Sequence, residues 1–337
     1  MTVLLTGANG FLGRRVLGRL LAHGYTNIRC LVRDSAKVAW LTDQYPTNSI
    51  EVVCANLRNR EDVQRTLEGV DLVFHLAASL KGTPADMFLD TVVGSKNLVQ
   101  GLGRRSGLRV VLVSSLGVLG TAELPRGALV SEQTPLERHP EQRDTYSHVK
   151  LRQEQLVREY AKRWGFELVI VRPGVIYGPG GSHFSPRVGL SLGNVFLYLG
   201  GRNPLPLTYV DNCAEAVVFA GLHARGDCET YNVIDDDIPN CHQYLDRYKE
   251  GVRPICSLRI PYPGLMLLSH FVKWYYHHSG GQLPSLFTPY KTATTWGGNR
   301  FDNSKLKSIG WKQLVSTRDA MNNTFTAFRA ESHHVSV

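Results

Sequence analysis

The sequence predicts an α/β fold built on a doubly wound parallel β-sheet, with a smaller lobe interleaved into the C-terminal half. Short aliphatic runs alternate with amphipathic helical patterns through the first half of the chain, which is typical of parallel sheets covered by helices on both faces. A glycine-rich turn directly follows the first aliphatic run. After about residue 172, proline and glycine clusters separate shorter segments, so we expect a second, interrupted lobe.

The individual elements follow from this alternation. Aliphatic runs predict strands at residues 3–5, 28–32, 72–76, 110–113 and 168–171, and a later run at 231–234 predicts another strand of the same sheet. Periodic apolar spacing predicts helices at residues 11–23, 63–67 and 91–102. We therefore expect a dinucleotide-binding type of domain over residues 1–172, with returning segments at about 207–237 and 300–325, and a substrate lobe over residues 173–206 and 238–300.

Composition narrows the class of protein. The chain has 337 residues, 43% hydrophobic and 20% charged, which excludes a mainly disordered protein. Its net charge of +9 favours an anionic partner such as a phosphorylated cofactor, a membrane surface or nucleic acid. No nucleic-acid reader motif is present, so we expect no nucleic-acid partner. Six widely spaced cysteines without a C-x-x-C pair predict neither a metal site nor a disulfide scaffold, and favour a reducing, cytoplasmic location.

Neither the N-terminus nor the most apolar later stretch predicts a membrane-inserted segment. The N-terminus lacks a basic region followed by a long apolar stretch, so no secretory signal is expected. The most apolar later stretch, residues 264–272, is much shorter than the ~20 residues that a spanning helix needs.

The first strand runs into a turn with glycines at Gly7, Gly10 and Gly13, followed by a helix. One glycine permits a tight turn, one lets the backbone approach a pyrophosphate, and one lets helix and strand pack closely. The helix N-terminus supplies unpaired N–H donors for phosphate. The turn therefore predicts a Rossmann-type dinucleotide site. At the end of the second strand, Arg33 favours NADP because a guanidinium pairs with a 2′-phosphate, whereas the adjacent Asp34 keeps NAD open.

Tyr146 and Lys150 lie at i and i+4, hence on one face of a predicted helix. A neighbouring ammonium stabilises phenolate, so we expect Tyr146 to be a stronger acid than free tyrosine and to exchange a proton with a substrate oxygen. Ser114 and Ser115 end the strand at 110–113, at the edge of the sheet where open α/β sheets bind ligands. A helix or turn cap is the alternative role for a serine there.

Together these motifs resemble the extended short-chain dehydrogenase/reductase family, which includes NAD-dependent epimerases and dehydratases. The resemblance runs through most of the chain and implies hydride transfer between a nicotinamide and a carbinol or carbonyl carbon. It implies Ser115, Tyr146 and Lys150 as catalytic residues, with Tyr146 as proton donor or acceptor, Lys150 on the nicotinamide ribose and Ser115 on the substrate oxygen. The cofactor residues that it implies are Gly7, Asn9, Gly10, Phe11, Leu12, Gly13, Arg33, Asn56, Leu57, Leu76, Ala77, Ala78, Ser79, Tyr146, Lys150, Pro173 and Val175.

Three positions depart from the family pattern. Asn56 stands where an Asp often contacts the adenine amino group, and Thr91 replaces an Asn credited with organising water, so we leave Thr91 out of the catalytic set. Val175 stands where sugar-nucleotide enzymes commonly carry an Asn that touches the substrate. The pattern is closer to the branch of 3β-hydroxysteroid dehydrogenases and dihydroflavonol-type reductases.

We therefore rank an NADP-dependent oxidoreductase for a lipophilic or aromatic, sterol-like ketone or alcohol above an NDP-sugar 4-epimerase or dehydratase with tightly bound NAD. A non-catalytic dinucleotide-sensing protein is the third alternative, and an intact acid–base pair weighs against it. The family also suggests a homodimer. Residues 247–312 contain ten basic and two acidic residues, and they include the aromatic run 271–276. We expect this segment either to rest on anionic lipid or to pack on the core.

Overall fold

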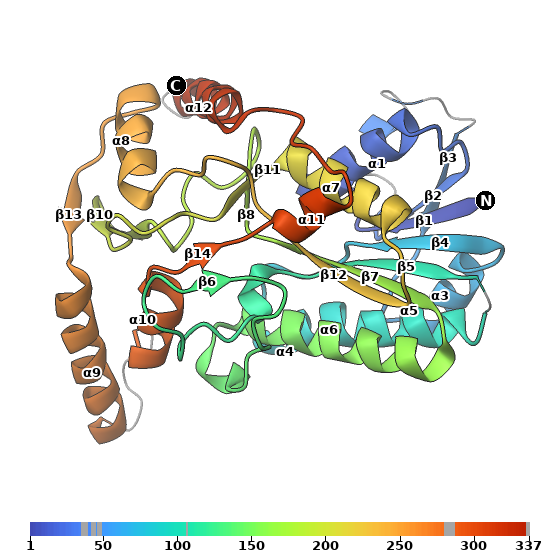
Figure 1. Cartoon of the computed structure of the whole chain (residues 1–337), viewed down its shortest axis with the longest axis horizontal. Coiled ribbons are helices and arrows are strands. Elements are labelled where there is room, and N and C mark those ends of the chain that lie inside the picture. The colour runs from blue at the N-terminus through green and yellow to red at the C-terminus, as the bar shows by residue number, and fades with distance from the viewer. Residues whose placement is uncertain (35–39, 42–44, 46–48, 106, 280–286, 335–337) are drawn as a thin grey trace.

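A seven-stranded parallel sheet forms the centre of the computed structural model, in the order β12-β7-β5-β4-β1-β2-β3 (Figure 1). The structure describes all residues except 35–39, 42–44, 46–48, 106, 280–286 and 335–337. Every neighbouring pair in this sheet is parallel. The strands are β1 (Thr2–Thr6), β2 (Ile28–Val32), β3 (Ile50–Cys54), β4 (Val70–His75), β5 (Arg109–Val113), β7 (Glu167–Pro173) and β12 (Cys228–Val233).

The predicted doubly wound α/β fold is confirmed. Each strand predicted from an aliphatic run is present, and the run at 231–234 is part of β12, which pairs with β7. The sequence analysis did not predict β3. This edge strand is only partly buried and contains Glu51, so it lacks the continuous apolar run that marks a central strand.

Helices cover both faces of the sheet (Figure 1). On one face, α1 (Phe11–Ala22) packs against α7 (Val210–His223) over a core that includes Val16 and Leu20. On the other, α3 (Arg60–Thr66), α5 (Gly94–Leu102) and α6 (Thr145–Trp164) bury residues such as Leu98 and Val157. The helix predicted at 91–102 is divided, since α4 (Pro84–Phe88) and a π-helical turn (Leu89–Val93) precede α5.

The smaller lobe contains the three-stranded sheet β13-β10-β9 and two pairs, β11-β8 and β14-β6. Its core includes Tyr198, Tyr244 and Phe325. Part of the segment at 300–325 packs on the main sheet, because α11 contacts β12, whereas α12 contacts α8. The strands and α-helices not yet named are β6 (Leu129–Val130), β8 (Val175–Tyr177), β9 (Gly189–Leu192), β10 (Val195–Tyr198), β11 (Leu207–Tyr209), α8 (Cys241–Gly251), β13 (Ser257–Arg259), α9 (Tyr262–His278), α10 (Pro289–Trp296), β14 (Arg300–Phe301), α11 (Ser304–Ser308) and α12 (Thr317–His334).

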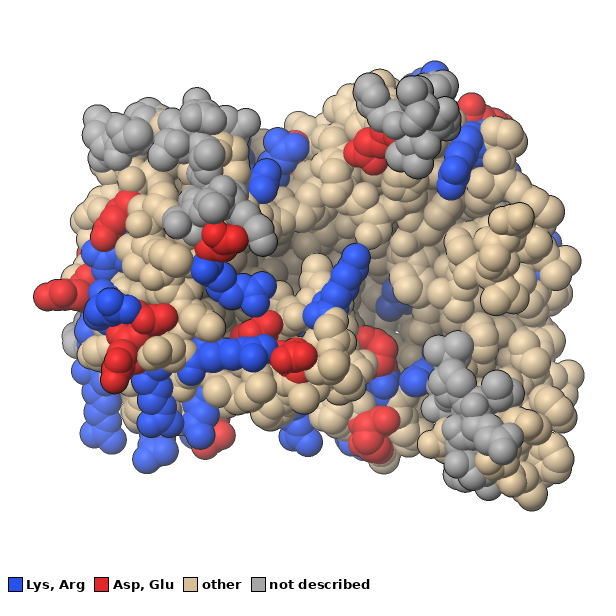
Figure 2. Space-filling view, turned by 180° about the vertical axis from the view of Figure 1, so that it is seen from behind, with Lys and Arg blue, Asp and Glu red and all other residues tan. Residues whose placement is uncertain are grey.

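The topology determines where a ligand site can form. The carboxyl ends of the central strands point toward the smaller lobe (Figure 1), and the strand order reverses between β1 and β4. Open α/β sheets bind ligands at such a reversal, outside the carboxyl ends of the strands. A hollow separates the two parts of the molecule in the space-filling view (Figure 2). Within the described residues, no helix has the length and apolar character needed to cross a membrane.

Candidate active site

The turn from β1 into α1 is shaped by its three glycines. Gly7 has a φ of +74°, which favours glycine, and its carbonyl accepts a hydrogen bond from the Gly10 N–H (2.9 Å). A Cβ atom at Gly13 would lie 2.0 Å from the Gly7 oxygen, so any side chain there would force the helix away from the turn. A Cβ atom at Gly10 would meet only the Gly7 oxygen, at 3.2 Å, so the backbone at Gly10 is open to a ligand on its other side.

The N-terminus of α1 has the properties of a phosphate site. Its N-cap, Gly10, provides no side-chain hydrogen bond, and no acidic residue lies in the first turn. The first N–H groups of a helix have no partner inside the helix and carry partial positive charge. A pyrophosphate therefore fits this turn, and the residues present match the dinucleotide that the family implies.

The segment after β4 lies beside the glycine turn. The Ala77 N–H donates to Thr6 Oγ1 (3.2 Å), and a Cβ atom at Gly7 would lie 3.0 Å from the Ala77 nitrogen. The Ser79 N–H donates to Thr91 Oγ1 (2.9 Å), so Thr91 holds the backbone of this segment in place. The predicted cofactor residues at 76–79 are thus brought next to Gly7.

Arg33 follows β2 and is 71% exposed, with its guanidinium 3.2 Å from Asp90. Arg58 binds the same carboxylate at 2.6 Å and was missed by the sequence analysis. The two guanidiniums thus share one counterion near the end of β2. Asn56 lies two residues before Arg58, and its side-chain oxygen accepts the Arg58 backbone N–H (3.0 Å). The side-chain oxygen of Asn56, the acceptor expected for the adenine, is therefore already hydrogen-bonded to the backbone of its own loop.

Tyr146 lies in the first turn of α6, whose start is fixed by the Asp144 carboxylate accepting the Ser147 N–H (2.9 Å). Its ring is partly buried against Met87 and Val92. Burial raises the pKa of Tyr146 to about 12, and the nearby Ser115 hydroxyl opposes the rise. The expectation of a phenol more acidic than free tyrosine is therefore wrong for this arrangement, since desolvation outweighs the stabilisation of the phenolate.

The side chain of Lys150 points into the protein interior. Its ammonium donates to the Val113 carbonyl (2.6 Å) and to the Gln153 side-chain oxygen (2.5 Å). Burial lowers the pKa of Lys150 to about 7, and the Glu154 carboxylate opposes this shift. The spacing predicts Lys150 and Tyr146 on one helix face. The Lys150 ammonium, however, is hydrogen-bonded to Val113 and Gln153.

Gln153 connects Lys150 to a buried polar network. Its amide donates to Ser95 Oγ (2.7 Å), and Ser95 lies 2.7 Å from the Nε2 atom of His75. The other ring nitrogen of His75 lies 2.7 Å from Thr6 Oγ1, next to the glycine turn. Burial and the Lys150 charge lower the pKa of His75 to about 3, so its ring is neutral. This network ties Lys150 to the strand that precedes the glycine turn.

The two serines after β5 have different partners. Ser114 is buried and donates to the Glu154 carboxylate (2.5 Å), which also accepts from Arg172 (2.5 Å). Ser115 begins the short helical turn after β5, where its hydroxyl accepts the Gly117 N–H (3.0 Å), and it is close enough to Tyr146 to lower the pKa of the phenol. Ser115 is therefore the serine that lies with Tyr146.

Most of the predicted site residues thus share the carboxyl edge of the sheet, from the ends of β1 to β5. Pro173 ends β7 and Val175 begins β8. The side chains of Val175 and Phe11 both pack against the core of the smaller lobe. The sequence analysis missed Arg58, Gln153 and the Glu154–Arg172 pair. The sequence held one signal for Gln153 and Glu154. They lie three and four residues after Lys150 on the same helix, so they share its face.

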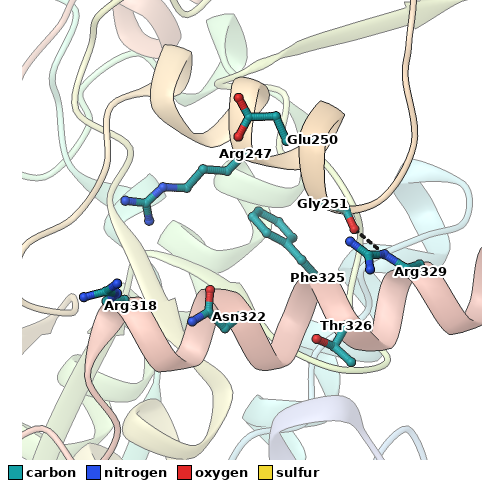
Figure 3. A pocket seen from close by; sticks show the side chains of 8 residues that line it. All are labelled: Arg247, Glu250, Gly251, Arg318, Asn322, Phe325, Thr326 and Arg329. Carbon is teal, nitrogen blue, oxygen red and sulfur yellow. Dashed lines mark hydrogen bonds between the residues drawn. The ribbon is translucent and has the colours of Figure 1, made fainter.

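A separate groove lies between α8 and α12, away from these residues (Figure 3). Arg329 crosses it and donates to the Gly251 carbonyl (2.6 Å). Across the residues that the structure describes, no group of three or more His, Cys, Asp or Glu side chains could hold a metal ion. The groove is lined by Arg247, Glu250, Gly251, Arg318, Asn322, Phe325, Thr326 and Arg329.

Known proteins are similar to this chain in sequence and in fold. The model of the NAD dependent epimerase/dehydratase family matches residues 3–233. The 3beta-hydroxysteroid-dehydrogenase/decarboxylase isoform 1 of Arabidopsis thaliana is 24% identical, over 96% of this chain and 79% of that protein. The N-acetyl-alpha-D-glucosaminyl-diphospho-ditrans,octacis-undecaprenol 4-epimerase of Escherichia coli O157:H7 is 26% identical, over 79% of this chain and 77% of that protein. The solved UDP-glucose 4-epimerase of Thermus thermophilus, in complex with NAD, has a TM-score of 0.69 at 21% identity, over 98% of this chain and 99% of that one.

The fold and the site define a nicotinamide-dinucleotide enzyme of the dehydrogenase, reductase or epimerase class. The chain belongs to the NAD dependent epimerase/dehydratase family, within the extended short-chain dehydrogenases/reductases.

Proposed function

We propose that the protein is an NADP-dependent oxidoreductase that interconverts a ketone and a secondary alcohol on a lipophilic or aromatic, sterol-like substrate. The observation that carries this proposal is that α6, which carries Tyr146 in its first turn, packs against the turn that begins at Ser115, at the carboxyl edge of the sheet. Two hydroxyls placed together there can both bond a single substrate oxygen. The proposed location is cytoplasmic.

The chain's own residues provide proton transfer and orientation. A nicotinamide, when bound, supplies the hydride acceptor or donor. Because its pKa is about 12, Tyr146 is a phenol at neutral pH and can donate a proton to the carbonyl oxygen of a ketone. Ser115 orients that oxygen by a hydrogen bond. Lys150 is held by Val113 and Gln153 and so fixes α6, which carries Tyr146, against the end of β5.

Two features support a lipophilic substrate over a nucleotide sugar. Val175 packs among apolar side chains, so this position offers no amide to a sugar or phosphate. The Arabidopsis relative is named as a 3beta-hydroxysteroid-dehydrogenase/decarboxylase, and a relative that is 34% identical over 53% of this chain is named sterol demethylase protein B of Methylococcus capsulatus. The alternative function is an NDP-sugar epimerase, and the name of the Escherichia coli relative, a 4-epimerase, supports this alternative.

A substrate panel on purified protein distinguishes these functions. We expect NADPH absorbance to fall when a sterol-like or aromatic ketone is added, with cofactor that exchanges freely. Retained NAD, together with turnover of a UDP-sugar without net redox change, would instead identify an epimerase. Cofactor binding without turnover on either class of substrate would support a dinucleotide sensor.

The preference for NADP depends on Arg33. Arg33→Ala is expected to weaken NADPH binding by about tenfold or more while changing NADH binding by less than about twofold, because a charge-assisted hydrogen bond to a 2′-phosphate exists only with NADPH. Titration of each cofactor, followed by tryptophan fluorescence, measures both constants. Arg60→Ala is the matched control, since Arg60 is also exposed but lies on α3. Equal losses for both cofactors would contradict the proposal.

Arg58 offers a second test of the same site. It shares Asp90 with Arg33, so a 2′-phosphate bound by both guanidiniums would compete with that carboxylate. We therefore expect Arg58→Ala to reduce NADPH affinity in the same direction as Arg33→Ala.

A further inference from the structure

Helix α9 exposes a stripe of large apolar side chains on the smaller lobe. Leu267 is 72% exposed, Phe271 59% and Trp274 53%. These residues occupy positions i, i+4 and i+7, so they lie on one face of the helix. The rings of Phe271 and Trp274 are in contact, with centroids 5.7 Å apart. The stripe is therefore one continuous surface rather than scattered side chains.

The opposite face of α9 packs against the protein and holds the helix in place, so the exposed stripe is not needed for this packing. Leu265 and Ser269 are fully buried there, and Leu265 packs with Leu199 and Trp296. Helix α10 also packs against α9. The exposed stripe is thus left over after the packing of the helix is complete, and α9 projects from the edge of the molecule (Figure 1).

The segment that carries the stripe has charged side chains of one sign. The sequence from residue 251 to residue 301 contains no aspartate or glutamate. Lys273 lies on α9 itself and is exposed, and Arg259 ends the neighbouring strand β13, where Leu258 adds a further exposed apolar side chain (58%). In the space-filling view, acidic and basic side chains both gather over the other part of the molecule, and the margin of the smaller lobe shows few charges of either sign (Figure 2).

We propose that α9 is an interfacial helix that docks the protein on the surface of an anionic phospholipid bilayer. The apolar stripe enters the boundary between headgroups and acyl chains, where Trp is favoured, and Lys273 and Arg259 bind lipid phosphates. This binding goes beyond the catalytic function proposed above and does not depend on it.

The charge pattern argues against a second copy of this chain as the occupant. A two-fold contact of α9 with itself would bring Lys273 close to its own copy. The segment has no carboxylate to compensate them. An anionic bilayer satisfies both the apolar stripe and the net positive charge of residues 251–301.

Vesicle flotation of the full chain tests the proposal. We expect binding to phosphatidylcholine vesicles that contain phosphatidylglycerol, weaker binding to phosphatidylcholine alone, and a loss of binding at high salt. The double variant Leu267→Ser/Phe271→Ser is expected to partition about tenfold or more less strongly, because it removes two of the inserted apolar side chains. Leu129→Ser/Leu314→Ser is the matched control, since both leucines are exposed elsewhere (53% and 48%).

Trp274 provides a reporter within the stripe. Its fluorescence should shift to the blue when anionic vesicles are added, and the Trp274→Phe variant, which remains folded by circular dichroism, should lose this shift. Reversal of charge in Lys273→Glu should weaken binding to anionic vesicles and leave binding to phosphatidylcholine alone unchanged.

Three results would overturn the proposal. They are wild-type protein that stays with the soluble fraction at low salt, a double variant that floats as well as the wild type, or a dimer in sedimentation that the double variant abolishes. The last result would identify a second copy as the occupant. Turnover of a water-soluble ketone by the same variants is expected to be unchanged, so a failure of membrane binding is separate from a failure of the proposed reaction.

Discussion

Tyr146→Phe is expected to lower turnover by about 10²–10⁴-fold, because it removes the hydroxyl that donates or accepts the proton. Affinity for the nicotinamide cofactor should change by less than about twofold, since the ring and its packing against Met87 and Val92 remain. Steady-state kinetics with the substrate found in the panel give the first quantity, and cofactor titration gives the second.

Tyr160→Phe is the matched control for this variant. Tyr160 lies on the same helix, far along it from Tyr146, and its hydroxyl accepts a hydrogen bond from Gln100 (2.8 Å). It should retain near-normal turnover. Near-normal turnover of Tyr146→Phe itself would remove Tyr146 from the proposed role, whether or not the cofactor binds.

Glu154→Ala is expected to lower the free energy of unfolding by about 3–5 kcal/mol. The Glu154 side chain is fully buried, and its carboxylate accepts from Arg172 and Ser114 at 2.5 Å each. Its removal leaves the Arg172 guanidinium, which is only 3% exposed, as a buried charge without its carboxylate. Urea unfolding of the wild type and the variant measures the difference.

Arg158→Ala separates this effect from a general loss of charge on α6. Arg158 binds the same carboxylate at 3.0 Å but its side chain is 30% exposed, so its removal should cost less than about 1 kcal/mol. If Glu154→Ala does not fold, the double variant Glu154→Met/Arg172→Met should recover most of the stability, because it removes both buried charges. Equal stabilities of Glu154→Ala and wild type would contradict the assignment.

The same pair predicts how stability depends on pH. Burial would raise the pKa of Glu154, but Arg172, Ser114 and Arg158 hold it below its ordinary value. The carboxylate therefore contributes stability above the pKa of the unfolded chain, and this contribution is lost as the pH falls through the lower folded value.

The sequence alone predicted the general architecture well, because aliphatic runs and helical periodicity report directly on which residues are buried. It failed at β3, whose partial exposure leaves a weak apolar signal. It also predicted which residues would meet at the carboxyl edge, because parallel topology carries the ends of β1 to β5 to one side of the sheet. It could not predict partners across the chain, such as Asp90 for both Arg33 and Arg58.

Local sequence therefore determined the glycine turn, the helix that carries Tyr146 and Lys150, and the family. The directions of their side chains and their protonation were decided by tertiary structure. Spacing along α6 relates Tyr146 to Lys150, but burial raises the pKa of the phenol, and Val113 and Gln153 hold the ammonium. The physical reason is that helix periodicity determines which face a residue occupies, whereas desolvation and hydrogen bonding depend on segments far away in sequence that pack against that face.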